Sequence, residues 1–445
     1  MKTMASTLHV LLATGVALGS SGCSGADRPA GALSRWVADA PPARPVSCVD
    51  VLPGASVQDA LDDADPGAAL CLAPGRHAGP LVITKPVTLW GPREAVVKSG
   101  GVGTTLRVTA PGTSLLGFTV DGSGVRFDQT DAAVLVHADD ARVEGLSVRG
   151  AVFGIMAERA HRVTIRGNEV AGLSTGPLGL RGDGIRLWET RDSVVDHNHV
   201  TGGRDLVVWY SPRNRVTGNL VENCRYGTHF MYSHGCHVED NLYLRDVVGI
   251  FVMYSRDMTL ARNVVAQASG AAGIGIGLKE SGNVVATRNL LVKDTVGIYV
   301  DTSPQQAGDA NRFEDNSIRL CGTGVVFHSS ETKNAFVGNA FRDNLAQVRV
   351  QGGGNALGVL WDGNDFDTYQ GYDLDGDGTG DVPYEMRSLS SSLVDAHPDL
   401  AFFHGSATLS LLDVVSHAFP LFAPDKVLVD ARPRMAAREE APGAH

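Results

Sequence analysis

Short blocks in which apolar residues alternate with other residues recur through the middle of the chain, between residues 184 and 263. A Tyr-Ser pair and an Asn each return in steps of 22 residues. These positions are Tyr210-Ser211, Tyr232-Ser233 and Tyr254-Ser255, with Asn219, Asn241 and Asn263. Alternation with a period of two is typical of strands, and self-similarity at a fixed period of this length indicates a solenoid. The pattern predicts an all-β chain folded as a right-handed parallel β-helix with 22–24 residues per rung.

The repeat continues with looser spacing on both sides of this block. Its further landmarks are Gly154 with Asn168, Gly184 with Asn198, Gly273 with Asn289, Gly297 with Asn316 and Gly324 with Asn339. We expect a β-helix of about ten rungs over residues 46–365, with extra residues bulging out as loops and a short capping helix near residues 56–61. The recurring Asn is predicted to be structural, because amides at the same turn of successive rungs can stack as a ladder, and Asn tolerates a left-handed backbone.

Strand alternation divides each rung into inward and outward positions. The residues assigned inward are Ile185, Leu187, Ile250, Val252, Ile274, Ile276, Ile298 and Val300. The outward columns are Arg186, Val207, His229 and Phe251, then Trp188, Trp209, Met231 and Met253. Large side chains stacked about 4.8 Å apart predict an exposed apolar ridge, which usually marks a binding surface. The predicted partner-binding residues are Trp188, Trp209, His229, Met231, Phe251 and Met253; the alternative is that a loop or the C-terminal segment covers the ridge.

Three residues of this ridge carry donor atoms that suit a soft metal. His229, Met231 and Met253 fall on two adjacent rungs, so their imidazole and thioether groups are expected to lie close together. Thioether and imidazole ligands suit Cu(I), and an exposed set of three donors suits transient handover more than storage. The sequence thus predicts a transient copper site here, secondary to the docking role of the ridge.

Composition narrows the class of partner and the compartment. The net charge of −11 over 445 residues argues against nucleic-acid binding. Residues 1–23 resemble an export signal, with Lys2 before an apolar stretch and small residues at its end. Cleavage before Cys23 would leave a cysteine for lipid attachment, and ordinary cleavage nearby is the alternative; both place the mature chain outside the cytoplasm. Residues 24–45 are predicted to form a flexible linker.

The remaining cysteines divide into one expected disulfide and three thiols. Cys48 and Cys71 flank the first ordered segment and are predicted to pair in an oxidising compartment. Cys224 and Cys321 occupy one column four rungs apart, too distant to bond, and Cys236 lies across a strand from Cys224. These three are interpreted as small buried core residues.

The segment after the β-helix, residues 366–432, combines an acidic loop with an apolar helical pattern. Asp373, Asp375, Asp377 and Asp381 alternate with Gly, which suits weak binding of calcium; the alternative is a solvated acidic turn. The loop is not an EF-hand, because the Glu at the twelfth position is missing. Residues 407–419 are predicted to form an amphipathic helix, either docking onto a membrane partner or capping the β-helix, and residues 433–445 a disordered tail.

Several blocks are specific enough to identify a resemblance. They are residues 225–233 (Arg-Tyr-Gly-Thr-His-Phe-Met-Tyr-Ser), 248–255, 273–280, 297–304 and the closing 371–384. Over most of residues 48–432 the chain resembles the NosD family of periplasmic β-helix proteins. The resemblance implies an accessory role, with the permease and ATPase of an ABC transporter, in building the copper centres of nitrous oxide reductase. A copper chaperone lipoprotein is a further candidate partner. Cys23 departs from the plain secretory signal that is usual in the family.

Two other functions compete with that role. A β-helix enzyme acting on uronic acids needs acid and base groups that converge in a groove. The candidates are Lys279, Glu280, Asp301, Arg186 and His229, but no compact pair of carboxylates recurs at lyase or hydrolase spacing. We therefore favour a non-enzymatic maturation scaffold and keep a carbohydrate-binding or polysaccharide-modifying protein of lyase or epimerase type as the alternative. A purely structural β-helix is the third class. The cargo stays open among copper, a sulfur species and conformational work on the client.

Overall fold

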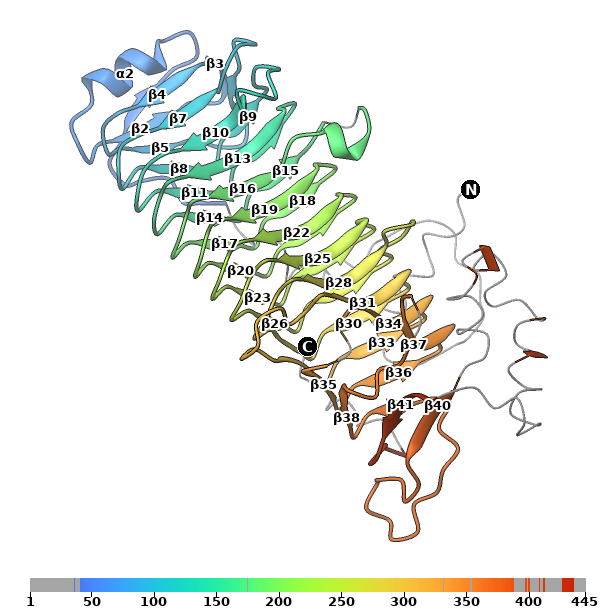
Figure 1. The fold of residues 1–445 in the computed structure, drawn as a ribbon. Helices are drawn as coiled ribbons and strands as arrows, with labels where there is room; N and C mark the ends of the chain where they lie inside the picture. The colour runs from blue at the N-terminus through green and yellow to red at the C-terminus, as the bar shows by residue number, and fades with distance from the viewer. Residues whose placement is uncertain are drawn as a thin grey trace, which may run out of the picture.

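The computed structural model is a long three-sided solenoid whose short strands stack rung upon rung (Figure 1). It describes residues 36, 41–173, 175–330, 332–352, 354–387, 397, 399–400, 408, 411–412 and 426–435. Nearly every ordered segment is a strand of two to six residues, as expected for alternating blocks separated by tight turns. The parallel β-helix predicted from the periodicity is confirmed.

Each complete rung contributes one strand to each of three parallel sheets; the first rung supplies only β1 and the last only β38 and β39. The first sheet has fourteen strands: β1 (Val49–Val51), β2 (Ala69–Leu72), β5 (Thr88–Trp90), β8 (Ser114–Leu116), β11 (Arg142–Glu144), β14 (Thr164–Arg166), β17 (Val194–Asp196), β20 (Arg215–Thr217), β23 (His237–Glu239), β26 (Thr259–Ala261), β29 (Val285–Thr287), β32 (Asn311–Glu314), β35 (Asn334–Val337) and β38 (Leu360–Asp362). The second has thirteen: β3 (Gly75–Ala78), β6 (Ala95–Lys98), β9 (Thr119–Asp121), β12 (Ser147–Arg149), β15 (Glu169–Ala171), β18 (His199–Thr201), β21 (Leu220–Glu222), β24 (Leu242–Leu244), β27 (Val264–Ala266), β30 (Leu290–Val292), β33 (Ser317–Arg319), β36 (Ala340–Arg342) and β39 (Asp365–Phe366). The third has twelve: β4 (Leu81–Ile83), β7 (Leu106–Val108), β10 (Ala132–Val136), β13 (Phe153–Glu158), β16 (Ile185–Trp188), β19 (Asp205–Trp209), β22 (Tyr226–Met231), β25 (Val248–Met253), β28 (Ile274–Lys279), β31 (Val296–Asp301), β34 (Thr323–His328) and β37 (Ala346–Val350).

Two details of the predicted solenoid are wrong. The stack has about fourteen rungs rather than ten, because the rungs before residue 150 lack the Gly-Ile signature that made the later ones visible. Ile274 is half-buried and pairs with Val248, so the glycine equivalent to Gly249 is Gly275, not Gly273. The loop inserted before β28 shifted the apparent register by two residues. The other residues assigned inward are fully buried, as predicted.

The recurring Asn residues form the expected amide ladder. Each side chain from Asn168 onward donates through Nδ2 to Oδ1 of the Asn on the next rung at 2.8–3.0 Å, and the series ends at Asn364, one rung beyond the prediction. The left-handed backbone lies at the residue before each Asn, such as His197 and Asp240, and not at the Asn itself. Buried backbone groups at this turn are thereby satisfied at each rung.

A second ladder accounts for the recurring Tyr-Ser pair. At the turn after the third sheet, the backbone N–H of Ser211 donates to Ser233 Oγ at 3.0 Å, and that of Ser233 donates to Ser255 Oγ at 2.9 Å. The preceding Tyr210, Tyr232 and Tyr254 adopt left-handed backbone and stack outside the turn, with ring centroids 5.2 and 4.9 Å apart. The pair is therefore first a turn device, with Ser inside the solenoid and Tyr outside.

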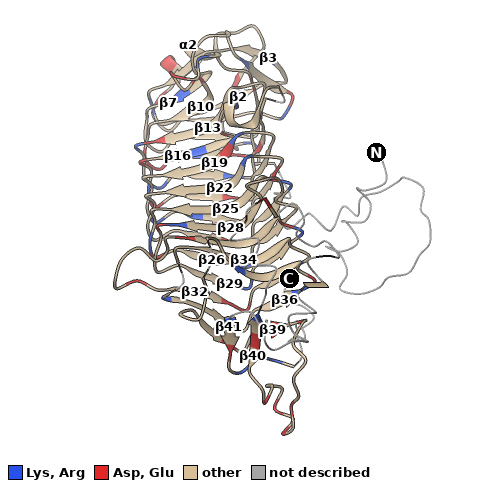
Figure 2. Cartoon of the chain, turned by 45° about the vertical axis from the view of Figure 1, so that its right-hand side comes forward, with Lys and Arg blue, Asp and Glu red and all other residues tan. Residues whose placement is uncertain are grey.

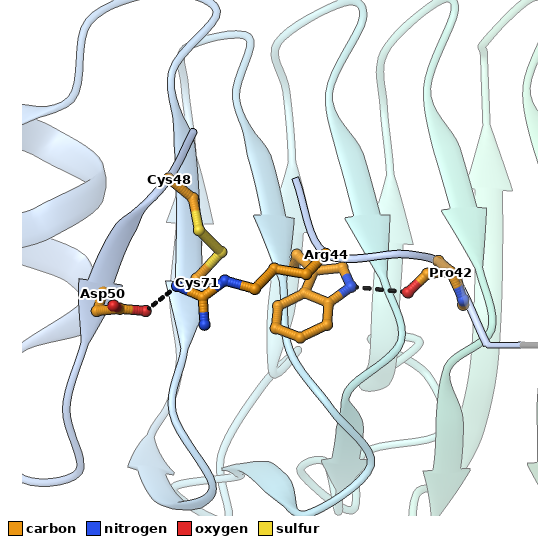
Figure 3. The surroundings of a disulfide bond; sticks show 6 residues. Pro42, Arg44, Cys48, Asp50 and Cys71 are labelled. Carbon is orange, nitrogen blue, oxygen red and sulfur yellow. Dashed lines mark hydrogen bonds and ion pairs between the residues drawn. A yellow bond between two sulfur atoms is a disulfide. The ribbon is translucent and has the colours of Figure 1, made fainter. Parts of the chain in front are cut away.

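Both ends of the solenoid are closed. At the start, helix α2 (Val57–Asp63) begins at Ser56, whose Oγ accepts from the N–H of Asp59, and the predicted disulfide joins Cys48 to Cys71 (Figure 3). At the other end, β40 (Tyr384–Arg387) pairs antiparallel with β41 (Lys426–Asp430). Asp430 accepts hydrogen bonds from the backbone and side chain of Asn364, which ends the amide ladder.

Positions of Lys and Arg and positions of Asp and Glu are both spread along the turns of the solenoid (Figure 2). Many of them pair between successive rungs, as Arg162 does with Asp140 and Arg213 with Asp192. Within the described residues, no helix is long and apolar enough to pass through a membrane. Cys23 lies outside the described residues, as does the predicted helix 407–419 apart from positions 408, 411 and 412, which are helical and exposed. Of the predicted tail, only residues 433–435 are described, and Arg434 N–H donates to Asn364 O at 2.9 Å.

The three free cysteines are buried, as predicted. Cys224 and Cys321 stand in one column at the turn between the second and third sheets. Along this column, Cys224 N–H donates to Asp246, Ala268 N–H to Asp294, and Cys321 N–H to Asn344. Two buried carboxyl groups, Asp246 and Asp294, therefore stand between the core residues of this column. Their burial could not be predicted from strand periodicity, because they lie in turns.

Candidate functional site

The outer face of the third sheet carries both predicted columns in the predicted register. Trp188 pairs with Trp209, and Met231 pairs with Met253 on the next strand. In the column beside them, His229 pairs with Val207 on one side and with Phe251 on the other. A period of two along the strand and a parallel register between rungs are sufficient to fix this arrangement.

The exposure of this face differs from the prediction. Val207, His229 and Phe251 point outward but are buried, with at most 8% of their surface exposed. Neighbouring rings cover them: the Tyr226 centroid lies 4.6 Å from that of His229 and 5.8 Å from that of Phe251. The second column (Trp188, Trp209, Met231 and Met253) is half-buried. The expected exposed ridge is thus a packed aromatic layer, of which only the second column and Arg186 at the end of the first reach solvent.

His229 is the centre of the site. Its Nε2 lies 3.1 Å from Met253 Sδ, and its Nδ1 lies 3.6 Å from Asp205 Oδ2. Nδ1 is buried without a hydrogen-bond partner within the described structure. Trp209 packs edge-on against the imidazole, with centroids 5.2 Å apart. The structure therefore joins two of the three predicted donors, and Met231 stands beside Met253 in the same column.

Asp205 lies beside Nδ1 of His229, on the side of the ring away from Met253. It was not among the predicted site residues. Its side chain is fully buried, and Arg225 donates to it through Nε at 2.9 Å. Burial opposes ionisation of the carboxyl group, but the contacts from His229 and Arg225 outweigh burial and lower the pKa of Asp205. An anionic Asp205 orients the ring so that Nε2 faces Met253. The sequence signal for it is an Asp at the start of a central strand, in register with Tyr226.

A second buried ion pair supports the same face. Asp183 accepts from Arg204 through both oxygens, at 2.8 and 2.9 Å. Arg186 lies 3.9 Å from Asp183 and places its guanidinium over Trp188, 4.3 Å from the ring centroid, and within 5.7 Å of the Trp209 centroid. Burial lowers the pKa of Arg186. The cation–π contacts fix the indoles of Trp188 and Trp209, the two members of the half-buried column nearest the N-terminal end of the solenoid.

The residues considered for sugar chemistry do not form one cluster. Lys279 pairs with Asp301 at 3.4 Å, and His328 contacts the same carboxylate at 3.2 Å, all on rungs beyond Met253. Glu280 lies in the next turn and accepts from Gln305. Arg186 and His229 belong to rungs before Met253, among aromatic rings. The five candidates thus divide into a Lys–Asp pair with a nearby turn residue and two residues among aromatic rings, His229 two rungs and Arg186 four rungs before Lys279.

Three of the four predicted calcium ligands lie together. Carboxylate oxygens of Asp373, Asp375 and Asp377 approach within 4.8 Å of one another. Asp373 accepts from the N–H groups of Gly376 and Gly378, which lower its pKa. Asp381 instead accepts from Leu374 N–H at 2.6 Å. The tight Gly-rich turn therefore gathers anionic oxygens at the end of the solenoid.

Comparison with known proteins gives three consistent matches, one to a family and two to individual proteins. The family described as periplasmic copper-binding protein (NosD) matches residues 172–371, which include the whole of the His229 site. A probable ABC transporter binding protein NosD from Pseudomonas aeruginosa is 30% identical over 409 residues, covering 85% of this chain and 91% of that protein. A protein of the same name from Stutzerimonas stutzeri is 28% identical over 364 residues, covering 79% and 83%. These names describe binding proteins and not enzymes.

Solved structures share the architecture at low identity. A catalytic unit of an α-1,3-glucanase from Streptomyces thermodiastaticus superposes with a TM-score of 0.54 at 15% identity, covering 74% of this chain and 70% of that one. An alginate lyase superposes with a TM-score of 0.52 at 12% identity, covering 72% and 85%. At this identity the likeness extends to the β-helix alone and carries no activity with it.

Proposed function

The chain belongs to the NosD family of periplasmic copper-binding proteins, and from this premise we propose that it is an accessory protein that acts with an ABC transporter in maturing the copper centres of nitrous oxide reductase. The family description supports copper and the periplasm, and the names of the relatives support the transporter. The reductase as client, and both the permease and the ATPase as partners, are part of the proposal. Copper is the cargo in this proposal.

The contact of His229 with Met253 carries the copper assignment. An imidazole nitrogen 3.1 Å from a thioether sulfur places side by side two donor types that suit Cu(I). Asp205 lies on the other side of the ring, as a carboxylate does behind many metal-bound histidines. Met231, next to Met253 in the half-buried column, would supply the third donor. Such a set favours Cu(I) as cargo over a sulfur species or purely conformational work.

The site also suits transient binding. Met231 and Met253 are half-buried, so one side of the donor set remains open to a partner. Trp188 and Trp209 continue the same column and are fixed by Arg186, which gives a rigid aromatic surface beside the donors. Large aromatic side chains at a rigid surface are typical anchors of protein interfaces. We propose that the client docks on Trp188 and Trp209, with Phe251 supporting the layer from beneath, and takes the ion from the methionines.

Substitution of the sulfurs tests the copper site. The double variant Met231→Leu, Met253→Leu keeps the apolar volume and removes both thioethers, so the fold should persist. We expect its Cu(I) affinity, measured by competition with a chromophoric chelator, to fall by about tenfold or more, since each lost ligand weakens binding on the order of 1 kcal/mol or more. Copper loading of the reductase in cells should fall with it.

Two further variants separate the site from its surroundings. Met258 is a buried core methionine outside the site, so Met258→Leu should leave Cu(I) affinity unchanged. Trp188 lies two rungs from His229, so Trp188→Ala should retain Cu(I) binding but weaken co-purification with the client, which separates docking from the metal. Full copper loading of the reductase by the double methionine variant would contradict the copper site and leave the face as a docking surface.

A further inference from the structure

Trp36, from the segment predicted to be a linker, lies on the outer face of the second sheet. It is 8% exposed and packs against four buried outward residues, Leu220, Leu242, Leu244 and Ala266, with Val264 at the margin. Its indole Nε1 donates to the backbone carbonyl of Asp240 at 2.7 Å. A buried indole that also satisfies its N–H is held by both packing and a hydrogen bond.

The apolar patch beneath Trp36 is unusual for an outward position. Leu220, Leu242 and Val264 pair in consecutive strands of the outer column, as do Leu244 and Ala266 beside them. Outward columns of a solvated sheet are normally polar, and a contiguous apolar patch marks a contact surface. Leu242 is completely buried although it faces outward. The residue that packs on this patch is Trp36, from the chain's own N-terminal segment.

A second group of contacts holds the same segment against the first rungs (Figure 3). Trp90 Nε1 donates to Pro42 O at 2.9 Å, and Arg44 pairs with Asp50 at 2.7 Å. A Cβ at Gly145 would lie 2.4 Å from the Pro42 ring, so this turn needs glycine to admit the proline. Trp36 and Pro42 contact turns four rungs apart, about 19 Å at the rung spacing. Six residues reach about 20 Å, so both attachments fit one chain.

We propose that Trp36 latches the N-terminal segment to the second sheet and thereby orients the solenoid at a lipid surface through Cys23. Cys23 precedes Trp36 by thirteen residues, a reach of about 45 Å, whereas it precedes Pro42, the next attached residue, by nineteen, a reach of about 65 Å. Attachment at Trp36 therefore shortens the tether by about a third and moves its attachment point about four rungs toward the middle of the stack. The second sheet is then held nearer the membrane than the third sheet, which carries the His229 site. This inference is independent of the copper proposal.

The latch is tested first by proteolysis of the exported full-length protein. Arg35 immediately precedes Trp36, so docking should protect this site from trypsin. We expect cleavage after Arg35 to be at least about tenfold faster in Trp36→Ala than in the parent, with Trp36→Phe between them because it keeps apolar packing and loses the hydrogen bond. Equal cleavage rates in all three proteins would overturn the latch.

The orientation is tested by energy transfer to acceptor-labelled vesicles that carry the lipidated protein. Single cysteines introduced as Ala171→Cys, exposed on the second sheet, and His137→Cys, exposed in the turn directly after strand β10 of the third sheet, take the donor dye, because the native thiols are buried. We expect stronger transfer from position 171 than from position 137, and a smaller difference when Trp36→Ala is added. Equal transfer from both positions, a difference that survives Trp36→Ala, or failure of Cys23 to incorporate labelled palmitate would each overturn the proposal.

Discussion

Asp246 and Asp294 occupy turn positions where an amide would satisfy every neighbour. Oδ1 of Asp294 accepts from Ala268 N–H at 2.8 Å, but its Oδ2 is buried without a hydrogen-bond partner in the described structure, and Asp246 repeats this arrangement. Two rungs after Asp294, Asn344 stands in the same column and donates from Nδ2 to the Ile318 carbonyl at 3.0 Å. Replacement by Asn should therefore supply the missing donor at the same place.

Burial raises the pKa of both carboxyl groups well above the ordinary value. A folded state that keeps such an acid protonated gains stability at low pH and loses it as pH rises above the unfolded pKa of about 4. The loss is about 1.4 kcal/mol per pH unit and per group while the folded group stays protonated, or up to about 4 kcal/mol between pH 5 and pH 8. Asp294→Asn removes this pH-dependent loss of stability. Its free energy of unfolding should therefore exceed that of the parent only slightly at pH 4, and the difference should increase up to pH 8.

Thermal unfolding followed by far-ultraviolet circular dichroism at pH 4, 5, 6, 7 and 8 measures the effect. Asp246→Asn should behave in the same way, and the double variant should show the flattest pH profile. Asp63→Asn, on the exposed side of α2, is the matched control and should follow the parent. An Asp294→Asn profile parallel to that of the parent, or a variant less stable than the parent at pH 8, would refute the reasoning.

Two other predictions concern the ladders and the acidic loop. Asn263→Ala removes an amide bonded to Val238 O and to the Asn residues on both neighbouring rungs, and should lower the free energy of unfolding by roughly 2–4 kcal/mol, whereas exposed Asn355→Ala should change it little. If Asp373, Asp375 and Asp377 bind calcium, with Asp381 holding the turn, then excess calcium should raise the melting temperature above that in chelator; identical values would leave the loop as a solvated acidic turn.

The 22-residue repeat was sufficient to predict the β-helix and the order in which its strands stack. A step of 22 residues with a period of two inside each block leaves one way to stack the strands, so the columns of Trp188 and of His229 followed from counting. The Asn ladder followed from the same regularity, because one local turn recurs on every rung. The disulfide followed from spacing and compartment. Where a loop changed the step, before β28, the count failed by two residues.

The sequence by itself therefore determined the solenoid and, except at the start of β28, its register and the direction of the side chains in the central strands, because those depend on neighbours within one repeat. Only the tertiary structure decided which outward residues are buried, that Asp205 stands behind His229, and that Asp430 ends the amide ladder. It alone placed Trp36 on the second sheet, about two hundred residues away in sequence. These contacts join side chains through lateral packing or through segments outside the repeat, and no periodicity encodes the distance between such groups.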